Sequence, residues 1–98
     1  MVELQLHGEK EIVTINAMVD SGAIEDFIDS EVCKTHGIKM TKAKHPREIY
    51  LGEGKPSAMG PVTHMTEVPM DISSYRELAT CQVANLQHHE VILKMPWL

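Results

Sequence analysis

The residues of this sequence best suited to chemistry are the tripeptide Asp20-Ser21-Gly22. An apolar run, Ala17-Met18-Val19, comes directly before the aspartate. The glycine after it allows a sharp turn or the close approach of another backbone. The tripeptide alone is a weak signal, because the same residues often mark a turn or the cap of a helix. Its meaning depends on the segments around it.

Three of those segments favour an active site. Phe27-Ile28 is an apolar pair that would bring the chain back to the core after the tripeptide. Val91-Ile92-Leu93 is predicted to form a second apolar strand near the C-terminus. We expect that second strand to run beside the Asp20 loop and support it. A glycine-tipped hairpin over about residues 49–62 lies between the two, where it could fold over a cleft.

The two cysteines and six histidines are the other candidates for chemistry. Cys33 and Cys81 are far apart and belong to no CxxC motif, so we expect two ordinary, partly buried thiols. No two histidines have the i, i+4 spacing of a zinc-binding helix. His88 and His89 are neighbours and would point to opposite faces of an extended segment. We therefore expect no metal and no other cofactor.

Composition narrows the class of protein. The 98 residues fit a single domain, residues 1–98, whose small core would gain from dimerisation. A net charge of −5 argues against binding to nucleic acid. No apolar run approaches the roughly 20 residues that cross a bilayer, and the N-terminus does not resemble a signal peptide. We expect an intracellular, cytoplasmic protein that does not bind a membrane.

Alternating apolar residues punctuated by glycine and proline predict an all-β protein with one short helix. Residues 2–19 are expected to form a hairpin. Residues 29–36 are the predicted helix, with Asp29 or Ser30 at its start and Gly37 at its end. Pro46 is expected to interrupt the chain before the 49–62 hairpin. Further strands are predicted over 65–72, 78–83 and 91–93, with a turn at 73–76.

The segments around the tripeptide resemble a known family. Residues 17–23, followed by Phe27-Ile28-Asp29, resemble the active-site segment of retropepsins, above all those of gypsy-type LTR retrotransposon polyproteins. His36-Gly37-Ile38 is similar to the end of the family's helix. Residues 91–98 are similar to its C-terminal hydrophobic pair, glycine and helix start. The resemblance extends over essentially the whole chain. It implies the closed β-barrel of acid proteases, with a flap hairpin at about 49–62 and half an active site per chain.

The resemblance implies an aspartic endopeptidase that acts on peptide or polyprotein substrates, in the cytoplasm or within a virus-like particle. This chemistry needs two carboxylates around one water, one ionised as base and the other protonated as acid. In aspartic proteases like charges about 3 Å apart cannot both ionise, so the pair shares a proton. The chain has a single D-[ST]-G sequence. A twofold homodimer would therefore have to bring two copies of Asp20 together.

The same resemblance implies roles for other residues. Ser21 would interlock with the partner subunit behind the carboxylates, and Gly22 would offer its backbone to the substrate. Ile92, Leu93 and Lys94 would support the active-site loop. The residues expected to contact substrate are Ala23, Ile24, Glu25, Leu51, Gly52, Glu53, Gly54 and Lys55.

Three departures from the family pattern leave a second interpretation open. Lys94 stands where the family usually has glycine, and an inward-pointing lysine would disturb the shared proton. Ile24 replaces a threonine, and the helix signalled by Pro96 and Trp97 would be truncated at Leu98. The chain could therefore be a catalytically silent module for dimerisation or peptide binding.

Overall fold

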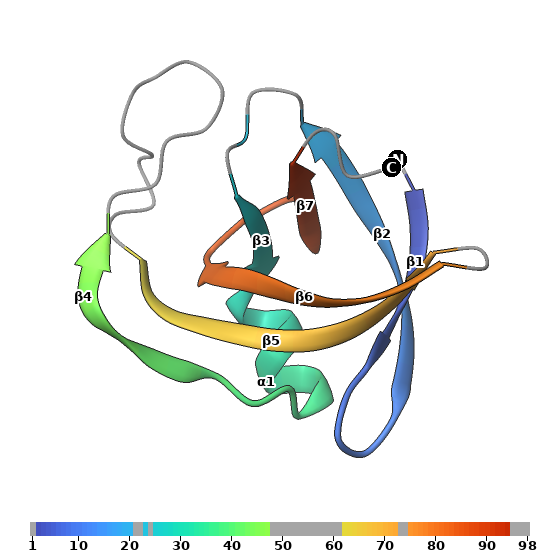
Figure 1. Cartoon of the computed structure of the whole chain (residues 1–98), viewed down its shortest axis with the longest axis horizontal. Coiled ribbons are helices and arrows are strands. Elements are labelled where there is room, and N and C mark those ends of the chain that lie inside the picture. Colours follow the sequence, from blue (N-terminus) through green and yellow to red (C-terminus); the bar gives the residue numbers. More distant parts are fainter. Residues whose placement is uncertain (1, 21–22, 24, 48–61, 73–74, 95–98) are drawn as a thin grey trace.

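The computed structural model describes residues 2–20, 23, 25–47, 62–72 and 75–94 (Figure 1). Strands account for most of these residues, and α1 is the one helix among them. The elements in chain order are β1 (Val2–His7), β2 (Ile12–Asp20), β3 (Asp26–Asp29), α1 (Ser30–His36), β4 (Thr41–Arg47), β5 (Val62–Ile72), β6 (Tyr75–Ala84) and β7 (Val91–Lys94). No helix in this part of the chain has the length and apolar character that a membrane crossing requires.

Six of the strands close into a barrel (Figure 1). The strand order is β1-β2-β7-β3-β6-β5-β4, and β1 also pairs with β5. That closing contact is short, joining Gln5 to Asp71 and Leu6 to Met70. Strand β4 lies outside the closed ring, against β5. The prediction of an all-β barrel with one short helix is confirmed.

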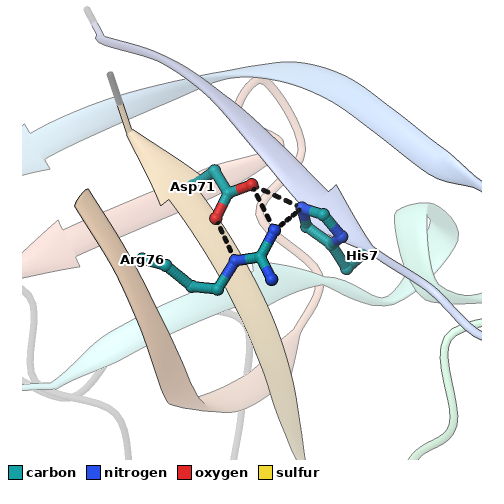
Figure 2. A network of polar contacts seen from close by, with 3 residues as sticks. All are labelled: His7, Asp71 and Arg76. Atoms are coloured by element: carbon teal, nitrogen blue, oxygen red, sulfur yellow. Dashed lines mark hydrogen bonds and ion pairs between the residues drawn. The ribbon is translucent and has the colours of Figure 1, made fainter. Parts of the chain in front are cut away.

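The barrel closure carries a side-chain network in addition to its backbone pairing (Figure 2). The Asp71 carboxylate on β5 lies 2.6 Å from Nε2 of His7 on β1. It also accepts two hydrogen bonds from the Arg76 guanidinium on β6, at 2.6 and 3.0 Å. The bonds from Arg76, and then that from His7, lower the pKa of Asp71 to about 2. The network thus links three strands at the seam where the ring closes.

The predicted hairpin over residues 2–19 is formed by β1 and β2, with Val2 paired to Ala17 and His7 to Ile12. Leu4 and Leu6 are buried in the barrel and the residue between them is exposed, as the period-2 alternation of a strand requires. The turn is held by a 2.9 Å hydrogen bond from the Gly8 amide to the carbonyl of Glu11.

Helix α1 buries Val32 and Cys33, as expected. It ends at Gly37, whose φ of 66° lies in the left-handed region that glycine adopts without strain. Asp29 occupies the N-cap position, but its side chain makes no capping hydrogen bond. That side chain is engaged elsewhere, by the backbone of the loop before β7.

Two sequence predictions about strand limits are wrong. Pro46 lies inside β4 instead of interrupting the chain. The register of β4 against β5 shifts between Lys42 and Arg47, and β4 is an edge strand, so the missing proline donor is tolerated there. Tyr75 belongs to β6 and not to a turn, because it pairs with Ile72. Of the predicted flap, residues 49–61 lie outside the described residues, and Val62 begins β5.

The interior contains two apolar clusters. The larger fills the barrel and reaches under α1, and it includes Leu4, Leu6, Ile28, Met70, Val91 and Leu93. The smaller cluster combines Ala23, Phe27, Val62, Ala84, Leu86 and Ile92. Met18 of β2 packs against this smaller cluster. The segments before and after the tripeptide are therefore anchored in the same apolar cluster.

Candidate active site

Asp20 is the last residue of β2, and β7 supports it. The two strands run parallel, with Ala17 opposite Val91 and Asp20 opposite Lys94. Among the described residues, the pairing of β2 with β1 extends to Ala17, which lies opposite Val2. Over the described residues, the final three residues of β2 are consequently held through β7.

Strand β7 is well placed for this role because it lies between β2 and β3. It pairs with β3 in the antiparallel sense, Ile92 with Phe27 and Val91 with Ile28. Its first three residues are fully or almost fully buried. The expected strand beside the Asp20 loop is thus present, and it is a central strand of the barrel.

The far end of the tripeptide is fixed by Ala23. Its amide donates a 3.1 Å hydrogen bond to the carbonyl of Asp20, which links residues i and i+3. Ala23 is buried and packs with Phe27 and Ile92. The backbone on both sides of Ser21-Gly22 is therefore tied to the barrel, while the Asp20 side chain remains partly exposed.

The side chain of Lys94 does not point into the barrel. Its side chain is exposed, so it does not compete for space within the barrel. Its backbone amide instead donates a 3.0 Å hydrogen bond to Oδ1 of Asp26. The position thus contributes a main-chain donor to the site, which any residue other than proline would supply.

Asp26 is the functional candidate that sequence reasoning missed. It lacks a following Ser/Thr-Gly, yet it is 7% exposed at the start of β3. Burial raises the pKa of Asp26, and the Lys94 amide and the Lys94 charge act against that rise. The sequence feature that could have indicated a buried Asp26 is its position directly before the apolar pair Phe27-Ile28.

Asp29, three residues further on, fastens the loop that leads into β7. Its Oδ1 accepts a 2.9 Å hydrogen bond from the Leu86 amide. Its own amide donates to the carbonyl of Glu90, also at 2.9 Å. The two ends of the segment from Leu86 to Lys94 are thus held by two carboxylates of one strand, β3.

The structure brings part of the predicted site together. Asp20 and Lys94 are paired, and Ile92 and Leu93 lie opposite Met18 and Val19. Glu25 is partly exposed, between the buried Ala23 and Asp26. The other predicted residues lie outside the described part of the chain, namely Ser21, Gly22, Ile24, Leu51, Gly52, Glu53, Gly54 and Lys55.

Other chemistries find little support among the described residues. No group of three or more His, Cys, Asp or Glu side chains within these residues could hold a metal ion. Cys33 and Cys81 are free and buried. Burial, and then the charge of Asp29, raises the pKa of Cys33 to about 11, and burial raises that of Cys81 still further. Both thiols are therefore protonated at neutral pH, which makes them poor nucleophiles.

Comparison with known proteins agrees with this geometry. The family model described as the PEG10/RTL1 protease domain matches residues 16–98. The matched region begins one residue before the apolar run that leads to Asp20 and includes β7. No solved structure gives a significant match to the chain.

Proposed function

The chain belongs to the PEG10/RTL1 protease-domain family, whose domains are retropepsin-like and come from gypsy-type retrotransposon-derived proteins, and we propose that it is an aspartic endopeptidase acting as a homodimer. Asp20 would be the carboxylate that each subunit supplies. The substrates would be peptide bonds of a polyprotein inside the cell.

One observation carries this proposal. Asp20 ends a strand at a point where the neighbouring strand β7 and the Ala23 amide both fix its backbone. A general acid or base must be held within hydrogen-bond reach of the reacting groups. The rigid backbone here supports a carboxylate that is partly exposed, as a group that meets substrate must be.

The proposed reaction follows from two such carboxylates. One Asp20 is ionised and takes a proton from the water held between the pair. Asp20 of the partner subunit is protonated and gives its proton to the oxygen of the scissile carbonyl. The water oxygen bonds to the carbonyl carbon and forms a tetrahedral intermediate with two hydroxyl groups. The first Asp20 then gives the proton that it took to the nitrogen, the partner's Asp20 takes a proton back from one hydroxyl, and the peptide C–N bond breaks to leave an acid and an amine.

The residues around Asp20 suggest how a peptide would bind. Gly22 would present its backbone, and Ala23, Ile24 and Glu25 would line one wall of the cleft. The hairpin at 49–62 would close over the substrate, with residues 51–55 at its tip. This arrangement would exclude water other than the attacking molecule.

The alternative, a catalytically silent module, rested mainly on Lys94. The exposed side chain of Lys94 supports the enzyme instead, since the residue is accommodated without entering the barrel. The amide of Lys94 is retained as a donor to Asp26. The backbone geometry around Asp20 therefore gives no reason to prefer the silent module.

The test is the cleavage of a peptide library at mildly acidic pH. Asp20→Asn removes the ionisable group while keeping its shape, so cleavage should fall by about 100-fold or more. Glu3→Gln, at an exposed position of β1, is the control for the lost charge and should cleave normally. A statine-type mimic of the transition state should inhibit the native protein. Cleavage that survives Asp20→Asn would overturn the proposal.

A further inference from the structure

The buried carboxylate of Asp26 has no part in the reaction proposed above. It lies at the start of β3, in register with Cys81 of β6. A buried carboxylate is costly unless it is hydrogen-bonded, and an apolar residue would fill the same space without that cost. The hydrogen bond that Asp26 accepts therefore indicates why a carboxylate occupies this buried position.

That hydrogen bond lies at the end of the β3–β7 pairing. The backbone pairing between these strands joins Val91 and Ile92 to Ile28 and Phe27, and it does not include Asp26. The amide of Lys94 is instead bound by Oδ1 of Asp26 at 3.0 Å. The side chain of Asp26 thus extends the contact between β3 and β7 by two residues.

Lys94 is also the residue opposite Asp20 on the other side of β7. The Asp26 carboxylate therefore binds the residue of β7 that lies opposite Asp20. Since Asp20 ends β2 opposite Lys94, a displacement of the end of β7 would be passed to the backbone of Asp20.

We propose that Asp26 is a positioning residue, which fixes the Asp20 carboxylate by binding the backbone amide of Lys94. The inference rests on the proposed function, because it concerns the same site. Burial of Asp26 and the resulting rise of its pKa are consistent with a group selected as a hydrogen-bond acceptor and not as a surface charge. Displacement of a reacting group by about 1 Å can lower a rate about 100-fold.

The experiment compares three variants of the full chain in steady-state cleavage. Asp26→Ala removes the acceptor, so kcat should fall about 100-fold with little change in KM. Asp26→Asn keeps a carbonyl oxygen as acceptor, so kcat should stay within about threefold of the native value. Asp29→Ala is the matched control, because it removes a 2.9 Å bond from the same strand to Leu86, which is not paired with Asp20.

The amide resonances of Asp20 and Lys94 give a second readout that needs no activity. Asp26→Ala should shift both resonances, whereas Asp29→Ala should leave the Asp20 resonance unchanged. If the native protein cleaves nothing, the proposed function fails, and these resonances still decide the role of Asp26. Should Asp26→Ala not fold, Asp26→Leu removes the same acceptor while filling its space with an apolar side chain.

Two results would overturn the inference. The first is a folded Asp26→Ala protein with native kcat and an unshifted Asp20 amide. The second is an Asp26→Asn protein as impaired as Asp26→Ala, because the effect would then come from the charge and not from the bond to Lys94.

Discussion

Asp20, the last residue of β2, lies directly opposite Lys94, the last residue of β7, in a parallel strand pair. The family usually has glycine at the position of Lys94. In this chain the lysine directs its side chain to solvent and gives its amide to Asp26. At this position the chain thus places a charged side chain on the surface and uses the main-chain amide as a donor within the barrel.

Lys94→Ala should therefore leave both stability and cleavage nearly unchanged. An exposed substitution of this kind alters the free energy of unfolding by about 0.5 kcal/mol or less. Lys94→Gly should cost about 0.5–1 kcal/mol more, because glycine weakens a strand. Urea unfolding and cleavage rates measure both effects. A large gain of activity in Lys94→Gly would instead identify the lysine ammonium as an inhibitory charge.

Asp26→Asn should be more stable than the native protein at neutral pH. Burial raises the pKa of Asp26, so the folded protein binds a proton more tightly than the unfolded chain. Native stability must then fall as the pH rises from about 4, the pKa of an unfolded aspartate, through the raised folded value. The neutral amide avoids this loss.

Thermal unfolding across this pH range checks that prediction. The difference between Asp26→Asn and the native protein should vanish below about pH 4. Glu31→Gln removes the same charge from an exposed site on α1 and is the control for the lost charge. A constant difference at all pH values would contradict the assigned cause.

Arg76→Gln should weaken the barrel closure at neutral pH. The Arg76 hydrogen bonds contribute most to lowering the pKa of Asp71 to about 2. The stabilisation is present above about pH 4 and is lost as the pH falls toward 2, where folded Asp71 is protonated. Lys34→Gln, which removes a surface pair at 3.9 Å, is the matched control. Equal urea midpoints for Arg76→Gln and the native protein at neutral pH would refute the role of the network.

Both thiols should be unreactive while the protein is folded. Cys81 is fully buried and Cys33 is 1% exposed. Burial also keeps them protonated at neutral pH, and the thiolate is the reactive form. Labelling with a disulfide reagent should be slow in buffer and fast in denaturant. Rapid labelling of the native protein would show that the barrel opens readily.

The sequence predicted the elements whose signals are local. Alternation through Leu4 and Leu6 predicted the first hairpin, and Gly37 predicted the end of the helix. The apolar run at Val91 predicted a strand near Asp20, because a short buried strand needs apolar residues on both faces. These features depend on neighbours in the sequence, and they are confirmed.

The features that were missed depend on distant residues. Asp26 accepts its hydrogen bond from Lys94, 68 positions away, and Asp71 lies against His7, 64 positions away. Pro46 suggests an interruption of the strand, because the sequence does not reveal that β4 is an edge strand, where a proline is tolerated. The sequence offers Asp29 or Ser30 as the cap of the helix, and the side chain of Asp29, which occupies the N-cap, instead accepts a hydrogen bond from the distant Leu86 amide.

The most direct test of the central claim mixes the native protein with Asp20→Asn at a fixed total concentration. If each active site needs one Asp20 from each of two subunits, only native homodimers cleave. Activity should then fall as the square of the native fraction, to about a quarter in an equal mixture of freely exchanging subunits. A linear fall, to about half, would show that one chain suffices for catalysis and would contradict the shared site.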